Sequence, residues 1–171
     1  GVVAMITNNS FIDGITHRQM RKHLLETFDD IYILDLHGNS KKREKAPDGS
    51  KDENVFDIQQ GVAISIFVRK EGMKQGLGAV HYAELYGTRE SKFTSLDGGD
   101  IKLVKWKTLE CVKPSYFFVG KDFSMATEYD NFIKLEDAFT VGGAGIKTER
   151  DKITIHFTKD ELLTVLNDFR S

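Results

Sequence analysis

The stretch Val55–Lys70, VFDIQQGVAISIFVRK, constrains the fold of this chain more than any other segment. A long charged segment comes before it, and its second half places apolar residues at every second position, namely Val62, Ile64, Ile66 and Val68. This period of two is typical of a β-strand. We therefore expect Phe56 to lie at the mouth of a sheet, outside its interior.

Composition indicates a globular protein. The 171 residues fit one ordinary domain, or the end of one domain joined to the start of another. The formal charge of −2 argues against a free-standing polybasic nucleic-acid binder, although local patches can still contact DNA. The single cysteine, Cys111, excludes an internal disulfide and fits a reducing cytoplasm. We predict that Cys111 fills space in the core and is not a nucleophile.

The first third of the chain predicts a strand–helix–strand unit. Residues 1–7 form a continuous apolar run, which is typical of a parallel strand covered on both faces. Thr16 and Gln19 have the spacing of a capping box, and an apolar helical stripe follows at Met20, Leu24 and Phe28. With a strand at residues 31–36, this order predicts a parallel pair. Because a domain seldom begins with a central strand, we expect a partial segment of a larger enzyme, with no membrane span.

The remainder of the chain is predicted to change near residue 97 from an α/β region to a region of short strands. Before it, we expect strands at residues 61–70 and 79–86 and a short helix at Thr88–Leu96. After it, we expect short strands at residues 101–104, 116–119 and 153–157. A last helix then starts at a capping box of Thr158 and Glu161, with an apolar face of Leu162, Leu163, Leu166 and Phe169. The prediction is an α/β region over 1–97 and a β-rich α+β region over 98–171.

Several segments resemble gamma-type adenine-N6 DNA methyltransferases. GVVAMITNNSFIDGITHRQMRKHLLETF is similar to the strand and helix after their catalytic loop, and FDDIYILDLHGN and VFDIQQGVAISIFVRK are similar to the next two strands. AELYGTRESKFTSL and FTVGGAGIKTERDKITIHFTKDEL resemble segments of large single-chain restriction–modification proteins of type ISP and type IIG. The resemblance implies a partial methyltransferase-type mixed sheet, whose last strand is antiparallel to its neighbours. The start of a target-recognition or connecting region would follow.

The resemblance also implies an activity for the parent protein. Such an enzyme transfers a methyl group from S-adenosylmethionine to an adenine of double-stranded DNA, and a type ISP or IIG protein also cleaves unmodified DNA. The family's glycine-rich cofactor loop has no counterpart here. Its Asn/Asp-Pro-Pro-Tyr/Phe motif needs consecutive prolines, whereas the only prolines are Pro47 and Pro114. We therefore assign no catalytic residue and no bound cofactor to this segment, which would need the missing N-terminal part of the domain as its partner.

One wall of a target-base pocket is what the resemblance assigns to this chain. It implies that Phe56 stacks on the extruded base, as base-modifying enzymes require. From the residue pattern alone, an aromatic that plugs the loop onto the core is the more common case. Asn8 and Asn9, at the end of the first strand, are weaker candidates for lining the cleft.

Two groups of basic residues are candidate DNA contacts. The charged segment 37–54 holds Lys41, Lys42, Arg43 and Lys45, which would supply affinity for phosphates. The alternative, equally open, is a solvated loop whose cations pair with Glu44, Asp48, Asp52 and Glu53.

The second group is Lys147 and Arg150, which follow a glycine-rich stretch. That stretch is not a phosphate-binding P-loop, because Ile146 separates its last glycine from the lysine. Ordinary pairing of Lys147 and Arg150 with Glu149 and Asp151 is slightly favoured over DNA contact.

Other chemistry finds little support. The five histidines lack the clustered spacing of a zinc site, and Trp106 is expected to anchor a small core. Two further hypotheses remain beside the methyltransferase segment. One is a non-catalytic DNA-specificity module that acts in trans, and the other is an α/β protein-interaction domain.

Overall fold

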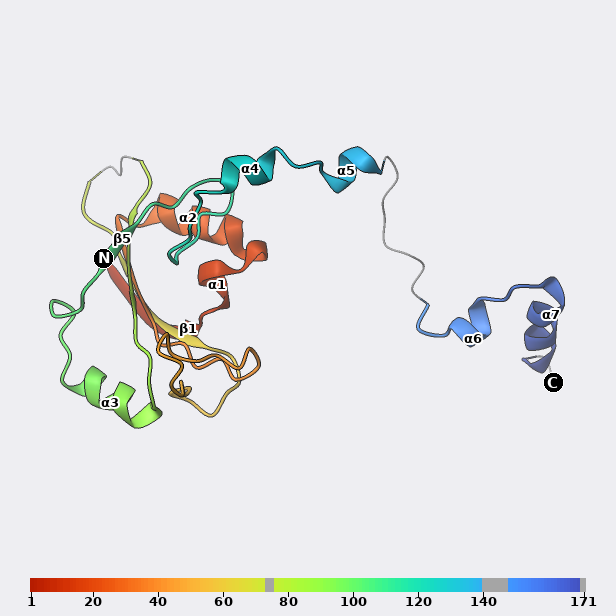
Figure 1. Ribbon diagram of the computed structural model, residues 1–171, viewed down its shortest axis with the longest axis horizontal. Coiled ribbons are helices and arrows are strands. Elements are labelled where there is room, and N and C mark those ends of the chain that lie inside the picture. The colour runs from red at the N-terminus through yellow and green to blue at the C-terminus, as the bar shows by residue number, and fades with distance from the viewer. Residues whose placement is uncertain (73–75, 140–147, 170–171) are drawn as a thin grey trace. The chain divides into compact units, whose positions relative to one another are not determined.

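The computed structural model describes residues 1–72, 76–139 and 148–169. The chain divides into two compact units, Gly1–Asp122 and Phe123–Ser171. The first unit contains a five-stranded sheet with the strand order β1-β3-β2-β4-β5 (Figure 1). The boundary that we place near residue 97 falls inside this first unit, and its functional meaning stays a prediction.

The sheet is mixed, and strand β3 determines this. β3 (Val62–Val68) is antiparallel to both of its neighbours, β1 (Val2–Asn8) and β2 (Asp30–Asp35). β4 (Ala79–Glu84) is parallel to β2, and β5 (Lys107–Leu109) is antiparallel to β4. The predicted mixed α/β fold, with an antiparallel strand at residues 61–70, is therefore confirmed.

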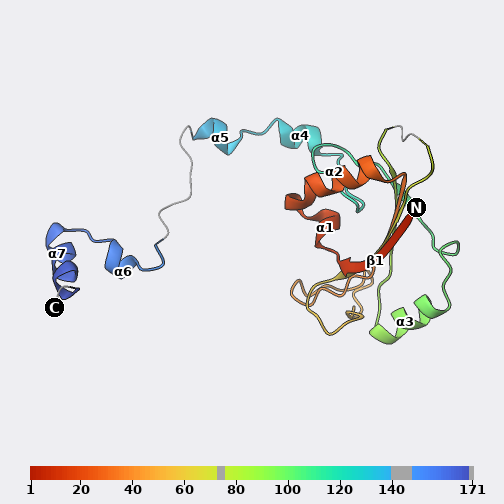
Figure 2. The ribbon, with the colours of Figure 1, turned by 180° about the vertical axis from the view of Figure 1, so that it is seen from behind.

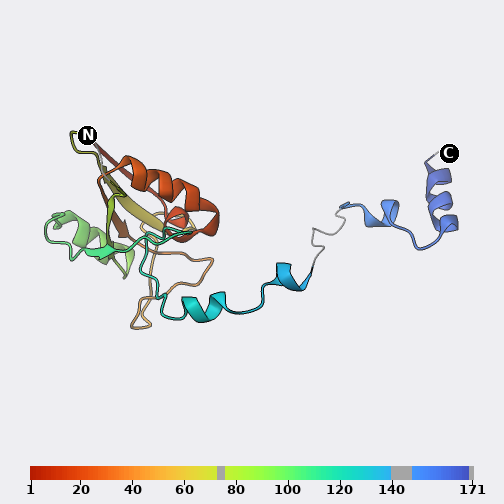
Figure 3. The ribbon, with the colours of Figure 1, turned by 90° about the horizontal axis from the view of Figure 1, so that it is seen from above.

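Helices lie on both sides of the sheet. α1 (Ser10–Asp13) and α2 (Arg18–Thr27) lie on one side, and α3 (Arg89–Asp97) lies on the other (Figure 3). Because successive strand side chains point to opposite faces, β3 contributes to two apolar clusters. The larger cluster, on the α2 side, includes Leu25, Ile31, Ile33, Ala63, Phe67, Val80 and Phe118. The smaller one consists of Leu36, Val55 and Val62, with Leu34, Ile64, Leu85 and Leu96 packed against it.

The expectation for the first strand was wrong in two respects. β1 and β2 run in the same direction, but β3 lies between them, so they do not form a parallel pair. β1 is also an edge strand in the described chain, and its apolar side chains are exposed: Val2 by 67 %, Val3 by 45 %, Met5 by 44 % and Ile6 by 51 %. The apolar run of β1 therefore does not correspond to a strand covered on both faces.

The first long helix begins later than its sequence indicates. Residues 15–17 form a 3₁₀ turn, and α2 starts at Arg18 with no side-chain cap, so the predicted box of Thr16 and Gln19 is wrong. Leu24 and Phe28 pack against the larger cluster as expected. Met20 instead remains 49 % exposed, because the buried face of the helix is centred on Arg21 and Leu25.

Beyond residue 98 the chain has fewer strands than predicted. In the described residues of this region, β5 is the only strand; residues 101–104 and 116–119 form turns and irregular structure. The segment predicted as a strand at 153–157 is the end of α6 (Asp151–Thr154) followed by a loop. Alternation over three or four residues was too short a signal to separate strand from turn.

The second unit is described by itself. Besides α6 it contains α4 (Ala126–Asp130), α5 (Leu135–Ala138) and α7 (Lys159–Asp168). The capping box at the start of α7 is confirmed, because Thr158 and Glu161 bond each other's backbone N–H groups. The predicted apolar face of α7 is partly exposed, by 39–70 % at Leu162, Leu163, Leu166 and Phe169. No helix among the described residues has the length and apolar character needed to cross a membrane.

Candidate functional site

A group of polar side chains lies at the end of the sheet where β1, β2 and β4 finish. The antiparallel β3 starts at this same end, since Asn8 pairs with Val62 and Asp35 with Ala63. The chain between β2 and β3, residues 36–61, forms a long loop beside the end of β1 (Figure 2). We call it the β2–β3 loop.

Phe56 lies on the β2–β3 loop, just before β3. Its neighbour Val55 is buried in the smaller apolar cluster, whereas Phe56 itself is 43 % exposed. The backbone N–H of Phe56 donates to the side-chain oxygen of Asn54 (2.9 Å). The structure therefore places Phe56 outside the core at the mouth of the sheet, as the sequence predicted; its stacking role stays a prediction.

Gly38, near the start of the β2–β3 loop, contacts Asn54 in the second half of the same loop. The Asn54 side chain donates to the carbonyls of Gly38 (3.1 Å) and Gln60 (2.6 Å). Gly38 has a φ of +81°, and a Cβ added to it would lie 2.4 Å from the Cα of Asn54. Only glycine fits this close approach, so Gly38 brings the two ends of the loop together and fixes where Phe56 emerges.

A polar cluster centred on His37 borders the loop, and the sequence did not reveal it. The imidazole Nδ1 lies 2.8 Å from Glu44 and Nε2 lies 3.2 Å from Glu84, while the ring stacks on Tyr86 with centroids 3.9 Å apart. Asn9 donates to Asp35 (2.9 Å), whose carboxylate also accepts the N–H of His37 (3.0 Å). Apart from Tyr86, these residues line a cavity of about 180 Å³.

Burial changes the protonation behaviour of this cluster. Burial raises the pKa of the Asp35 carboxyl above its usual value, and the nearby His37 and Asn9 only partly oppose it. Burial, together with the neighbouring carboxylates, also raises the pKa of Tyr82 and Tyr86, which both donate to Glu84. Both phenols are therefore protonated donors that hold Glu84 in place. No single sequence motif signals this site, because its members come from three strand ends.

The four cations of the loop, Lys41, Lys42, Arg43 and Lys45, are all exposed. Three of the interspersed acids bond residues other than these four cations: Glu44 bonds His37, Asp52 bonds Lys92, and Glu53 bonds Lys51 and Arg89. Within residues 1–72, 76–139 and 148–169, no ion pair forms to any of these four cations. Of the lysines and arginines in this fully described loop, only Lys51 pairs with one of the loop's acids, Glu53, so the choice between DNA contact and a loop neutralised by its own acids stays open.

The other predicted contacts lie in separate parts of the chain. Arg150 is exposed and precedes α6 in the second unit. Lys147 and the glycine-rich stretch before it lie outside the described residues. Asn8 and Asn9 occupy different places: Asn9 lines the His37 cavity, whereas the Asn8 side chain accepts the N–H of Ser10 (2.7 Å).

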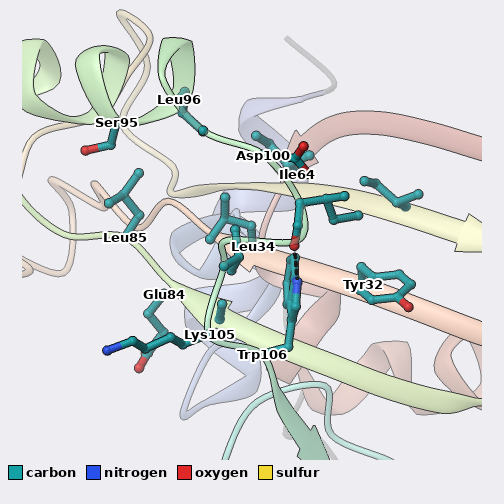
Figure 4. A pocket seen from close by; sticks show the side chains of 15 residues that line it. Tyr32, Leu34, Ile64, Glu84, Leu85, Ser95, Leu96, Asp100, Lys105 and Trp106 are labelled. Carbon is teal, nitrogen blue, oxygen red and sulfur yellow. Dashed lines mark hydrogen bonds between the residues drawn. The ribbon is translucent and has the colours of Figure 1, made fainter.

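A larger cavity of about 410 Å³ opens on the α3 side of the sheet (Figure 4). Its walls are mainly apolar, formed by Tyr32, Leu34, Ile64, Leu96 and Trp106. The rings of Trp106 and Tyr32 form a T-shaped pair with their centroids 5.2 Å apart. The indole N–H of Trp106 donates to the Ile101 carbonyl (2.8 Å). Trp106 thus holds its own loop against Tyr32, whereas its expected role as the anchor of a small core stays a prediction; the charged residues of the cavity lining are Glu84, Asp100 and Lys105.

Cys111 is part of the apolar packing of the first unit. Cys111 packs against the larger apolar cluster, and burial raises the pKa of its thiol to about 11, so the predicted packing role is confirmed. In the described parts of the chain, no group of three or more His, Cys, Asp or Glu side chains is arranged to hold a metal ion.

Comparison with known proteins adds information that the geometry lacks. The ATP-dependent type ISP restriction-modification enzyme LlaBIII, solved bound to DNA, matches 98 % of this chain at 29 % identity with a TM-score of 0.67. The chain is similar to a segment of restriction–modification enzymes. A nuclease-deletion mutant of the type ISP restriction-modification enzyme LlaGI, in complex with a DNA substrate mimic, matches 98 % of the chain at 25 % identity with a TM-score of 0.66.

Other comparisons set the limits of this similarity. The DrdV–DNA complex matches 99 % of the chain at 23 % identity with a TM-score of 0.64, which supports the fold alone. The chain spans 12 % of the matched LlaBIII chain, 16 % of LlaGI and 18 % of DrdV. No protein-family model matches the chain, and no curated protein matches it either. Its similarity to restriction–modification enzymes therefore rests on solved structures.

Proposed function

We propose that this chain is the C-terminal part of an adenine-N6 DNA methyltransferase domain, joined to the start of a target-recognition region, within a restriction–modification enzyme. The observation that carries the proposal is the exposed Phe56 at the end of a sheet whose β3 is antiparallel to both neighbours. The similarity to two type ISP enzymes over 98 % of the chain supports it.

In this proposal Phe56 stacks on an adenine extruded from the duplex. An aromatic that receives a base must present a free face, and Phe56 does so while Val55 anchors the backbone beside it. The exposed cations Lys41, Lys42, Arg43 and Lys45 then contact DNA phosphates from the same loop. Double-stranded DNA is thus the proposed partner.

Methyl transfer itself needs groups that this chain does not supply. In S-adenosylmethionine-dependent enzymes of this kind a glycine-rich loop after a strand holds the cofactor, but β1 ends at Asn8 and is followed by Asn9 and Ser10. After β2, the N–H groups of His37, Gly38 and Asn39 already donate to carboxylates. These residues do not fit the cofactor, so we assign S-adenosylmethionine and catalysis to the missing N-terminal part of the domain.

The exposed edge strand β1 is the proposed junction with that missing part. Beside it, a mainly apolar groove of about 370 Å³ runs along α2, lined by Met5, Met20, Leu24 and Phe67 among others. An exposed apolar edge strand is a ready template for pairing with another strand. The isolated chain is expected to be inactive, and methyl transfer should appear only when the N-terminal part is supplied. Methyl transfer by the isolated chain would contradict this assignment.

The central test is the Phe56→Ala substitution in the full-length parent protein. Transfer of labelled methyl groups to a long unmethylated phage DNA should fall about 10- to 100-fold, because stacking on one base contributes about 1–3 kcal/mol. Mass spectrometry of the digested DNA identifies N6-methyladenine as product. Phe93→Ala is the matched control, because Phe93 on α3 is similarly exposed (45 %). Equal activity of the two variants would reject the stacking role.

The loop cations are tested by the salt dependence of DNA binding. Replacing Lys41, Lys42, Arg43 and Lys45 by alanine should lower the slope of log affinity against log salt by about 0.9 for each lost phosphate contact. Four exposed lysines after α3 serve as the control set: Lys102, Lys105, Lys107 and Lys113. If the loop variant binds DNA as the wild type does at low salt, a protein-interaction domain becomes the better interpretation.

A further inference from the structure

We infer that Arg89, at the start of α3, is a positioning residue that fixes the Phe56 backbone for base stacking, and that Lys92 anchors α3 to the same loop. This inference rests on the proposed function and deepens it. It assigns a role to a helix on the face of the sheet opposite α2.

Arg89 holds the residues on both sides of Phe56. Its guanidinium donates to the carbonyls of Asn54 (2.9 Å) and Phe56 (3.0 Å). The same group bonds the carboxylate of Asp57 at 2.8 Å. The Arg89 side chain therefore bonds three of the four residues 54–57, and Phe56 is the only aromatic among these four. Its carbonyl and N–H are both engaged, by Arg89 and Asn54, while its ring stays exposed.

The shape of the guanidinium matters more than its charge. Asp57 is 92 % exposed in its side chain, so the ion pair with Arg89 is screened by water and contributes little. The two backbone carbonyls require donors that diverge at a fixed angle, which the planar guanidinium provides and an ammonium group does not. We therefore expect Arg89→Lys to keep one of these contacts and lose the other.

Lys92 fixes the helix that presents Arg89. Its ammonium group is fully buried and lies 2.7 Å from the Asp52 carboxylate, which is buried as well. The ammonium also donates to the carbonyls of Leu36 (2.7 Å), at the start of the β2–β3 loop, and Glu53 (2.6 Å), in its second half. Asp52 in turn accepts the N–H groups of Gly38 and Gly87. The loop and α3 are thus joined through a buried core of polar contacts.

This arrangement prepares the loop before any base arrives. A loop of this length would ordinarily sample many conformations, and a stacking platform has to be held close to its working geometry by its supporting contacts. The Arg89 contacts place Phe56 without covering its ring. Removing them should weaken stacking and leave cofactor binding, assigned to another part of the protein, unchanged.

A double-mutant cycle in the full-length parent protein tests whether Arg89 acts through Phe56. Arg89→Ala should lower kcat for methyl transfer to the phage DNA about 5- to 10-fold, with the KM for S-adenosylmethionine unchanged, and Arg89→Lys should restore part of the loss. In a Phe56→Ala background, Arg89→Ala should cause no further loss, because residues that act as a unit are not additive. Independent, multiplicative losses would overturn the inference.

Backbone amide exchange of residues 54–60 tests the positioning independently of activity. Arg89→Ala should speed exchange in this segment about tenfold, because the loop then opens locally. Glu90→Gln, a change at the exposed neighbouring position of the same helix turn, should leave exchange unaltered. If the wild type transfers no methyl group, the proposed function fails, and exchange alone decides whether α3 fixes the loop. Unchanged exchange in Arg89→Ala would overturn the inference whatever the activity.

Discussion

Two buried cations, Arg21 and Lys92, lie on opposite faces of the sheet and stabilise the chain next to them through different kinds of partner. Arg21 on α2 is fully buried and donates only to backbone carbonyls, those of Phe11, Gly14, Ser115 and Tyr116. Lys92 on α3 is equally buried but also has a buried carboxylate partner, Asp52. The α2 face adds a large apolar cluster to its cation, whereas the α3 face has a small one. The β2–β3 loop, which carries Phe56, therefore depends more on the Lys92–Asp52 ion pair than on apolar packing.

The largest effect is expected from Lys92→Met. The substitution leaves the Asp52 carboxylate buried without its counter-charge, and breaking a buried pair in this way costs about 3–5 kcal/mol. Urea unfolding of the variant measures this loss as a lower free energy of unfolding. Lys22→Met on α2 is the control, since Lys22 forms only an exposed pair with Glu26 and should change stability by less than about 1 kcal/mol. A similarly small loss at Lys92 would mean that water reaches Asp52.

Arg21→Met should cost less, about 2–3 kcal/mol. It removes donors from four carbonyls, but the contacts to Gly14 and Ser115 are only partly buried, and the Gly14 carbonyl still accepts the N–H of His17. The penalty of about 1–3 kcal/mol for a buried, unpaired carbonyl therefore applies to few of them, and no charge is left without a partner. Burial already lowers the pKa of the Arg21 guanidinium, so part of its contribution is offset by lost hydration. The same urea experiment checks the order of the two variants. If Arg21→Met is the more damaging, carbonyl bonding outweighs the ion pair, and the contrast drawn between the two faces is reversed.

The two buried carboxylates Asp52 and Asp35 also differ in their partners, and this difference predicts that stability depends on pH. Asp35 lacks a lysine partner, and burial raises its pKa, so the folded state favours the protonated carboxyl. The stability that Asp35 contributes is then complete below its ordinary pKa and is lost as the pH rises through the raised value. Asp35→Asn removes this titration while keeping an acceptor for Asn9.

The measurement is the free energy of unfolding of wild type minus that of Asp35→Asn, followed from about pH 3 to about pH 7. This difference should become less favourable to the wild type as the pH rises. The neighbouring His37, Glu44 and Tyr82 are common to both proteins. A difference that does not vary with pH would show that the ionised Asp35 is as well solvated in the folded state as in the unfolded one.

The sequence predicted those parts of the molecule that local patterns encode. The alternation at 62–68 identified β3, and the Thr158 box identified the start of α7, because each signal lies within a few neighbouring residues. The exposed position of Phe56 followed from the same local pattern. The family resemblance, not periodicity, supplied the antiparallel direction of β3.

The buried polar contacts could not be predicted in this way. Arg21, His37 and Lys92 carry charge or titrate, so their residue types indicate surface positions, yet all three are buried. Their partners come from distant segments, such as Ser115 for Arg21 and Asp52 for Lys92. Exposure of β1 was missed for the related reason that its apolar run says nothing about which strand lies beside it.

The smallest effect on stability is expected from Arg89→Ala, and it gives the sharpest contrast with Lys92. The Arg89 side chain is 41 % exposed, and its charged partner Asp57 is 92 % exposed, so their pair is worth at most about 1 kcal/mol. Urea unfolding should therefore barely separate this variant from wild type, although methyl transfer falls. Lys92 would then hold α3 in place, while Arg89 determines where Phe56 points. A loss of stability close to that of Lys92→Met would instead make both residues part of one structural anchor, with no separate positioning role for Arg89.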